Sequence, residues 1–158
     1  MALLAAIALS SFLFQVDPKG TVDITSLKVY HASARRYQNK KQELAFVNFN
    51  ITADLSSLFH WNTKQLFVYL QAEYDNTQGD KNAIVIWDRI IRRKEDAYIN
   101  FAGKNKYKLR DLSSSFKNVP PANFSLKYNV MPYVGILTYG EAAKAADPIA
   151  FPAAQARV

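Results

Sequence analysis

The segment Phe59–Ile91 constrains the fold of this chain more than any other part of the sequence, because it holds two apolar runs around one polar loop. In the first run every second residue is apolar: Leu66, Val68, Leu70 and Ala72. This period-two pattern predicts a half-buried strand, although Phe67 interrupts the polar series. The loop Asp75–Asp80 has turn-forming residues and one glycine that can take a positive φ. The second run, Asn82–Ile91, is apolar on both faces, so the two runs predict a core hairpin of an all-β domain.

The remaining body predicts more short strands, separated by turn signals about every 8–12 residues. Leu44–Leu55 and Phe124–Val130 both show the period-two pattern. Thr21–His31 alternates in two registers, which predicts either one strand with a bulge or two short strands. Gly103–Asn105 predicts a hairpin turn into a strand over Lys106–Leu112. About eight strands result, so we predict a mostly β fold, an antiparallel β-sandwich.

The two tryptophans belong to the segment of the predicted hairpin. Trp61 precedes its first run and Trp87 lies within its second run. Because each indole has a large apolar surface, we expect both to be largely buried anchors of the core.

The N-terminal segment Ala2–Val16 contains no charged residue. A helix needs about 20 apolar residues to span the hydrocarbon core of a bilayer, and this run is shorter. Three interpretations remain open: the hydrophobic region of a signal peptide, a buried core helix, or a membrane anchor whose first part is missing. Asp17–Gly20 then ends any helix, because proline and glycine break the pattern.

The net charge of +7 could attract phosphate or anionic lipid. The basic residues are scattered, however, and no recognition helix, glycine-rich phosphate loop or RNA-binding aromatic motif accompanies them. A solvated basic surface is therefore favoured over nucleic-acid binding. The absence of cysteine excludes thiolate nucleophiles, thiolate metal sites and disulfide chemistry.

Residues for catalysis are hard to find in this sequence. Its only histidines are His31 and His60, and His60 is expected to lie in a turn. The chain has no G-x-S-x-G elbow and no H-x-x-x-H spacing, and Asp75 and Asp80 lack the acidic density of a calcium loop. A catalytic pair of carboxylates for glycoside cleavage can come from distant parts of a chain, so this class of site stays open. We therefore predict no catalytic, cofactor-binding or metal-binding residues and a protein that is not an enzyme.

Two triplets match the acceptor pattern for N-linked glycans. Asn50 begins one and Asn123 begins the other. Asn123 follows Pro120 and Pro121, where a surface loop is expected. Asn50 lies within a predicted strand and is the less favoured acceptor.

Four segments of the chain together resemble one family, the third subunit of the eukaryotic signal peptidase complex. These segments are Leu44–Leu55, Phe59–Tyr74, Asn82–Ile91 and Asn123–Leu137. The specific motifs within them are Trp61-Asn62-x-Lys64-Gln65-Leu66, Trp87-Asp88 and the Asn-Val-x-Pro segment Asn129–Pro132. The resemblance spans roughly Ala2 to Leu137, most of the chain.

The resemblance implies a non-catalytic, type II single-pass protein of the endoplasmic reticulum membrane. It further implies an incomplete anchor helix over residues 1–16, a lumenal β-sandwich over 17–140 and a flexible tail over 141–158. The glycan would stand on Asn123, whereas Asn50 has no support from the family.

As implied by the resemblance, the chain supports the removal of signal peptides by packing on a separate catalytic serine protease subunit. Its partners would be that subunit, the other members of the complex and the lipid bilayer, with no cofactor and no nucleic acid. An alternative is a stand-alone lumenal or secreted β-sandwich that binds a ligand. A third and weaker alternative is a basic nucleic-acid binder.

Overall fold

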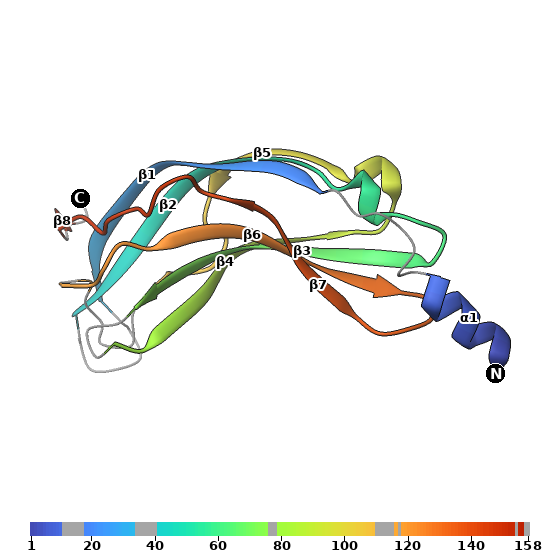
Figure 1. The fold of residues 1–158 in the computed structure, drawn as a ribbon. Coiled ribbons are helices and arrows are strands. Elements are labelled where there is room, and N and C mark those ends of the chain that lie inside the picture. The colour runs from blue at the N-terminus through green and yellow to red at the C-terminus, as the bar shows by residue number, and fades with distance from the viewer. Residues whose placement is uncertain are drawn as a thin grey trace.

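The computed structural model describes residues 1–10, 18–33, 41–75, 79–109, 116, 118–153 and 155–156. Figure 1 shows a short N-terminal helix followed by two layers of strands. The elements are α1 (Ala2–Ser10), β1 (Lys19–Ser33), β2 (Lys41–Asp54), η2 (Ser56–Leu58), β3 (Thr63–Asp75), β4 (Lys81–Ile91), η3 (Lys94–Asp96), β5 (Tyr98–Lys104), β6 (Asn123–Pro132), β7 (Thr138–Lys144) and β8 (Gln155–Ala156).

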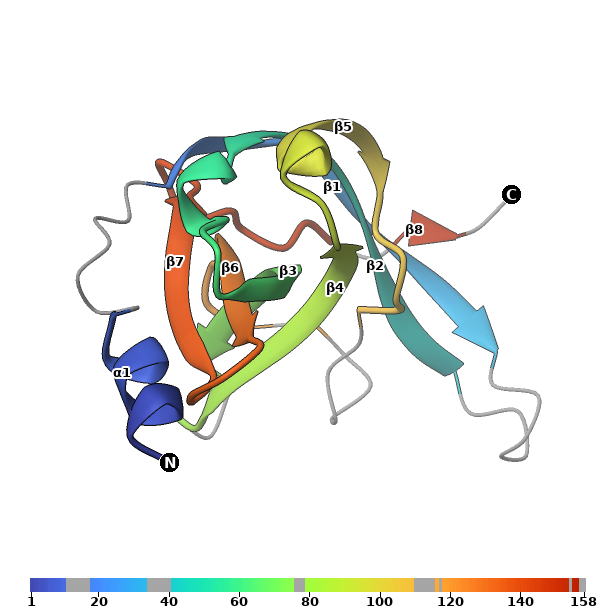
Figure 2. The ribbon, with the colours of Figure 1, turned by 90° about the vertical axis from the view of Figure 1, so that its right-hand side faces the viewer.

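The strands form two four-stranded sheets. Sheet A has the order β5-β2-β1-β8 and sheet B the order β4-β3-β6-β7. All neighbours pair antiparallel except β1 and β8, which are parallel. Figure 2 views the molecule from the end that carries α1 and shows the two sheets on opposite sides of the interior. The predicted mostly β, antiparallel fold is therefore confirmed.

The core lies between the sheets and is lined by the apolar faces that the period-two patterns predict. The buried residues of β2 include Val47, Phe49, Ile51 and Ala53, and those of β3 include Leu66, Val68, Leu70 and Ala72. Those of β6 include Phe124, Leu126, Tyr128 and Val130. All belong to one cluster, and burying each large aliphatic side chain contributes about 1.5–3 kcal/mol. The register shift between Ile24 and Ser26 confirms the predicted bulge in β1.

Strand β4 differs from its prediction, because it lies at the edge of sheet B and is not buried on both faces. A bulge explains its apolar pattern: Leu70 pairs with Trp87, and the next residue, Gln71, pairs with Val85. The extra residue, Ile86, lets two consecutive side chains turn to the core. Ile90 instead faces outward and is 53% exposed.

The segment after β5 does not form the predicted hairpin strand over Lys106–Leu112, of which residues 110–112 lie outside the described residues. The chain instead crosses from sheet A to sheet B. The Asn105 amide N–H donates to Val47 O at 3.0 Å, and the Lys106 N–H donates to Ile86 O at 2.7 Å. The backbone of one short crossing thus bonds to a strand of each sheet.

The C-terminal part of the chain continues the fold beyond residue 140, where the sequence analysis ended the domain. β7 runs to Lys144, and Ala122 and Ile149 exchange two backbone hydrogen bonds of 2.9 and 2.8 Å. Phe151 stacks on Phe116 with ring centroids 4.6 Å apart. Residues up to Phe151 therefore pack on the β domain. The segment is rich in alanine and proline, but its large apolar side chains, Ile149 and Phe151, contact the domain.

At the other end, α1 covers residues 2–10, and residues 11–16 of the expected anchor lie outside the described residues. Among the residues that are described, no helix is both long and apolar enough to cross a membrane.

The two tryptophans have different environments. Trp87 is 4% exposed, stacks on Phe101 at 5.2 Å and meets Phe49 edge-on at 6.3 Å, so its predicted burial is confirmed. Trp61 is 55% exposed, so the prediction of burial is wrong for this residue. It lies in the turn between η2 and β3, outside both sheets, where no facing strand covers the indole.

Replacing Trp87 by alanine should therefore lower the free energy of unfolding by about 3–5 kcal/mol, because it leaves a cavity at a contact between the sheets. Trp61→Ala is the matched control and should change it by less than about 0.5 kcal/mol. Denaturant unfolding of both variants measures the difference. Equal losses would contradict the environments described here.

Candidate functional site

The two histidines are the first candidates for chemistry, and His60 has a structural role. Its Nδ1 accepts a hydrogen bond from the Asn62 backbone N–H at 3.2 Å, and its carbonyl oxygen accepts from the Thr63 N–H at 2.9 Å. Burial lowers the pKa of His60, which favours the neutral ring that this acceptor role requires. The predicted turn position is confirmed.

His31 lies opposite Glu43 in the register of β1 and β2. Sequence reasoning missed this acid because it comes from the neighbouring strand. The two residues line a pocket of about 440 Å³ together with Phe116, Asn118 and residues 151–153. Glu43 Oε2 accepts the Phe116 backbone N–H at 2.7 Å, and the lining residues include no serine, threonine or cysteine. Among the described residues, therefore, this pocket places no nucleophile beside His31.

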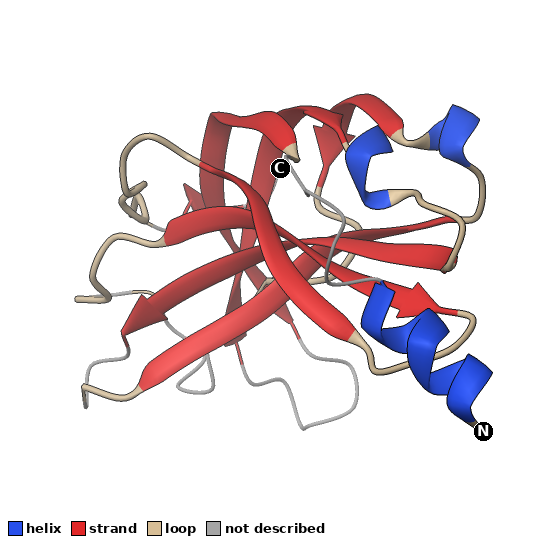
Figure 3. Cartoon of the chain, turned by 45° about the vertical axis from the view of Figure 1, so that its right-hand side comes forward, coloured by secondary structure: helices blue, strands red, loops and turns tan. Residues whose placement is uncertain are grey.

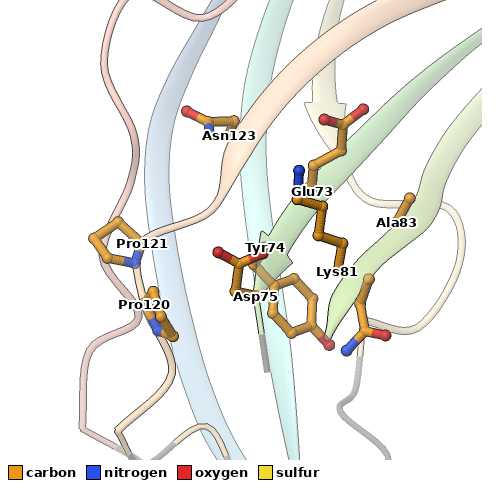
Figure 4. Close-up of a pocket in the computed structure, with 9 residues that line it drawn as sticks. Glu73, Tyr74, Asp75, Lys81, Ala83, Pro120, Pro121 and Asn123 are labelled. Carbon is orange, nitrogen blue, oxygen red and sulfur yellow. The ribbon is translucent and has the colours of Figure 1, made fainter. Parts of the chain in front are cut away.

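A second pocket of about 400 Å³ lies beside the turn of the β3–β4 hairpin, where β3 ends and β4 begins (Figure 4). Glu73, Asp75, Lys81 and Asn123 are among its lining residues. Glu73 accepts a hydrogen bond from Lys127 Nζ at 2.7 Å, and this bond is the main cause that lowers the pKa of Glu73. A carboxyl group with a lowered pKa is ionised near neutral pH and cannot act as a general acid there. Among the described residues, no three or more His, Cys, Asp or Glu side chains group to hold a metal ion.

The two glycan acceptors take different places in the sheets. Asn50 is exposed on β2, between Asp23 of β1 and Ala102 of β5. Asn123 is half-buried as the first residue of β6, opposite Glu73. Exposure in the folded chain thus does not favour Asn123, and both assignments stay predictions.

Exposed surfaces are the other candidates for function. The outer face of sheet B carries aromatic and apolar side chains, among them the half-buried Phe67 and Tyr69 and the exposed Ile90 and Tyr139. Phe67, which interrupts the polar series in the sequence, pairs with Ile90 across β3 and β4 and stacks on Tyr69 at 5.5 Å. The outer face of sheet A shows the polar residues Asn48, Asn50 and Thr52 at the centre of β2, and also Phe46 and Tyr98. An exposed apolar patch of this kind indicates an interaction surface.

A second apolar surface, which we call the α1 pole, lies beside α1. It consists of Trp61, Tyr133, Ile136 and Leu137, all exposed. The buried Asn62 side chain fixes its loop: Asn62 Nδ2 donates to Val134 O at 2.7 Å and Asn62 Oδ1 accepts the Val134 N–H at 3.1 Å. Gly135 has a φ of +121°, and a Cβ built there would lie 3.4 Å from Ala8 Cβ of α1. Figure 3 shows α1 next to the β6–β7 loop.

The sequence motifs of the resemblance converge on these surfaces. The Trp61–Leu66 motif pairs with Asn129–Pro132, since Thr63 lies opposite Pro132, and Gln65 Nε2 lies 2.9 Å from Met131 Sδ. The two motifs together build the base of the α1 pole.

The third motif, Trp87-Asp88, holds the crossing between the sheets. Asp88 accepts hydrogen bonds from Lys106 Nζ at 2.8 Å and from Tyr107 OH at 2.7 Å. These bonds, with that from Lys106 the largest, lower the pKa of Asp88.

Comparison with known proteins extends over almost the whole chain. A family model described as "Signal peptidase subunit" matches residues 1–154. The chain is similar to signal peptidase complex subunit 3 of Debaryomyces hansenii, with 38% identity over 157 residues that cover 92% of this chain and 82% of the relative. The Yarrowia lipolytica protein of the same name is 38% identical over 141 residues, or 85% and 76% of the two chains. The Caenorhabditis elegans protein of that name is 35% identical over 137 residues, or 86% and 76%.

The role of Asn62 can be tested by substitution. Asn62→Ala should lower the free energy of unfolding by about 1–3 kcal/mol, because the Val134 N–H and carbonyl both lose their partner. Faster amide hydrogen exchange at Val134 should accompany the loss. The exposed Asn50→Ala variant is the control and should stay within about 0.5 kcal/mol of the parent chain. An unchanged exchange rate at Val134 would argue against the role of the two hydrogen bonds between Asn62 and Val134.

Proposed function

The chain belongs to the signal peptidase subunit family, and on this basis we propose that it is a non-catalytic accessory subunit of the endoplasmic reticulum signal peptidase complex. In that role it supports the removal of signal peptides from nascent secretory proteins by packing on the catalytic serine protease subunit. The observation that carries the proposal is the similarity along residues 1–154. A stand-alone binding protein is not favoured, because the relatives are named as subunits of a complex.

The described side chains support a role without catalysis. His60 serves as a hydrogen-bond acceptor within a turn, and His31 faces a pocket whose lining offers no hydroxyl or thiol nucleophile. A hydrolytic triad needs such a nucleophile within hydrogen-bond reach of its base.

We further propose a lumenal β-sandwich on a single-pass type II anchor. Contacts between the sheets support the sandwich, since Phe49 of sheet A meets Trp87 of sheet B. The charge-free residues of α1 support an anchor over residues 1–16, followed by the β domain over 17–140 and a tail over 141–158. Because β7 extends to Lys144 and Ile149 and Phe151 contact the β domain, the β domain of this proposal extends to about residue 151 of that tail.

The surface proposed to contact the catalytic subunit is the outer face of sheet B. Ile90 is 53% and Tyr139 72% exposed on this face, and Phe67 and Tyr69 are half-buried. Covering them would remove apolar area from water, which drives most protein association. On the outer face of sheet A the central residues Asn48, Asn50 and Thr52 of β2 are polar, and the exposed Tyr98 lies on the edge strand β5.

Ile90→Asp tests this contact, because it would place an unpaired carboxylate within the proposed interface. The variant should lower the amount of catalytic subunit that co-purifies in mild detergent by at least about tenfold, equivalent to about 1.4 kcal/mol. Thr52→Asp, exposed on the outer face of sheet A, is the matched control and should leave recovery unchanged. Equal recovery with both variants would show that the contact lies on another surface. If no catalytic subunit co-purifies with the parent chain, the proposed function is refuted.

The glycan is proposed to stand on Asn123, in line with the resemblance and with the lumenal position. Endoglycosidase treatment of the chain made in its own compartment should shift its gel mobility. Asn123→Gln should abolish the shift and Asn50→Gln should keep it. A shift that survives Asn123→Gln would identify Asn50 as the acceptor.

A further inference from the structure

We propose that the α1 pole lies in the headgroup layer of a lipid bilayer, with Trp61 and the loop Tyr133–Leu137 at the boundary between water and lipid. This inference goes beyond the proposed function, since it concerns residues outside the surface assigned to the catalytic subunit. It assigns a membrane-contact role to the β domain itself, in addition to any anchor helix.

The first argument comes from α1. Its nine residues carry no charge, and none of them is buried. Leu3 is 73%, Leu4 50% and Leu9 64% exposed, on different sides of the helix. A helix that is apolar all round is stable in a protein core or in lipid. Because the described part of the chain does not bury α1, lipid is the environment that suits it.

The second argument is that α1 and the pole are in contact. Gly135, at the middle of the β6–β7 loop, lies against Ala8 in the last part of α1. The positive φ of +121° at Gly135 is a conformation that other residues rarely adopt, so the loop has the shape that this contact needs. Figures 1 and 3 both show the loop beside the helix. Lipid that surrounds α1 would therefore also reach the pole.

The third argument is the chemistry of the pole. Trp61 is 55%, Tyr133 67% and Ile136 74% exposed. Tryptophan and tyrosine are enriched at membrane–water interfaces, because each ring has an apolar body and a polar group. An exposed isoleucine beside them adds apolar area for the upper acyl region.

The backbone of the loop also fits this environment. The Val134 N–H and carbonyl both bond to the Asn62 side chain, and the Tyr133 N–H donates to Asn62 O at 2.8 Å. Backbone groups without partners are costly near hydrocarbon. Asn62 therefore provides partners for the backbone of Tyr133 and Val134 from within the protein, and the side chains of the loop stay free to contact lipid.

The exposed charges of the neighbouring segments have mixed signs. They are Lys64, Arg92, Arg93, Lys94, Glu95 and Asp96, of which Arg93 and Asp96 form an ion pair at 3.3 Å. The association should therefore depend on apolar and aromatic side chains and should change little between low and moderate salt.

Tryptophan fluorescence of the full chain tests the proposal directly. The chain is reconstituted into phosphatidylcholine vesicles whose lipids carry bromine in the upper acyl region. Brominated lipid should quench Trp61, and Trp61→Phe should remove most of the quenching, because the remaining indole of Trp87 is only 4% exposed. Trp61→Phe changes an exposed side chain, so the variant is expected to fold.

Two exposed isoleucines provide matched variants. Ile136→Asp, at the pole, should reduce the quenching at least by half, whereas Ile90→Asp, on the outer face of sheet B, should leave it unchanged. The two proposals are tested separately: Ile90→Asp should lower the recovery of the catalytic subunit without changing the quenching, and Ile136→Asp should lower the quenching without changing that recovery. A parent chain that does not float with vesicles, or quenching that is equal in the parent chain and Trp61→Phe, would overturn the inference. A third result would also overturn it: brominated lipid does not quench Trp61, yet Trp61 is shielded from aqueous iodide in the assembled complex. A protein partner would then cover the pole.

Discussion

The contact of Trp87 with Phe49 and Phe101 is the interaction on which the rest of the fold depends. The indole comes from β4 at the edge of sheet B, and the two phenyl rings come from β2 and β5 of sheet A. Aromatic pairs of this geometry contribute about 0.5–1.5 kcal/mol each beyond the area they bury. Arg89 covers the group, with its guanidinium carbon 5.3 Å from the Trp87 ring and 5.6 Å from that of Phe101. The open side between β4 and β5 is thus closed by side chains, without a shared hydrogen-bond ladder.

The crossing after β5 strengthens the same side. Its backbone bonds to Val47 of one sheet and Ile86 of the other, and Asp88 holds the Lys106 and Tyr107 side chains from outside. Because the interior is used for packing, the surface is what this fold offers to partners. Sheet B contributes an aromatic outer face, and its β6–β7 loop contributes the α1 pole. A single sheet therefore presents two apolar surfaces that are suited to two different partners, a protein subunit and a bilayer.

The sequence by itself determined the strands that form the core and the family. Period-two patterns in β2, β3 and β6 locate the buried faces, because a strand side chain can reach the interior only at every second position. The motifs around Trp61, Trp87 and Asn129 identify the family before any contact is known. Phe67 also gave a signal, since an aromatic residue in a polar series marks the outer face as unusual.

Only the tertiary structure decided what depends on neighbours from distant parts of the chain. Trp61 is exposed although Trp87 is buried, because burial requires a facing strand and the turn after η2 has none. The apolar residues of β4 reach two faces because a bulge against β3 shifts its register, and local periodicity cannot distinguish this from burial on both sides. The segment 105–109 crosses between the sheets because its hydrogen-bond partners lie on β2 and β4, and sequence spacing does not show such partners. The outer face of sheet B and the α1 pole exist only after strands and loops from separate segments have been brought together, so folding alone makes these surfaces.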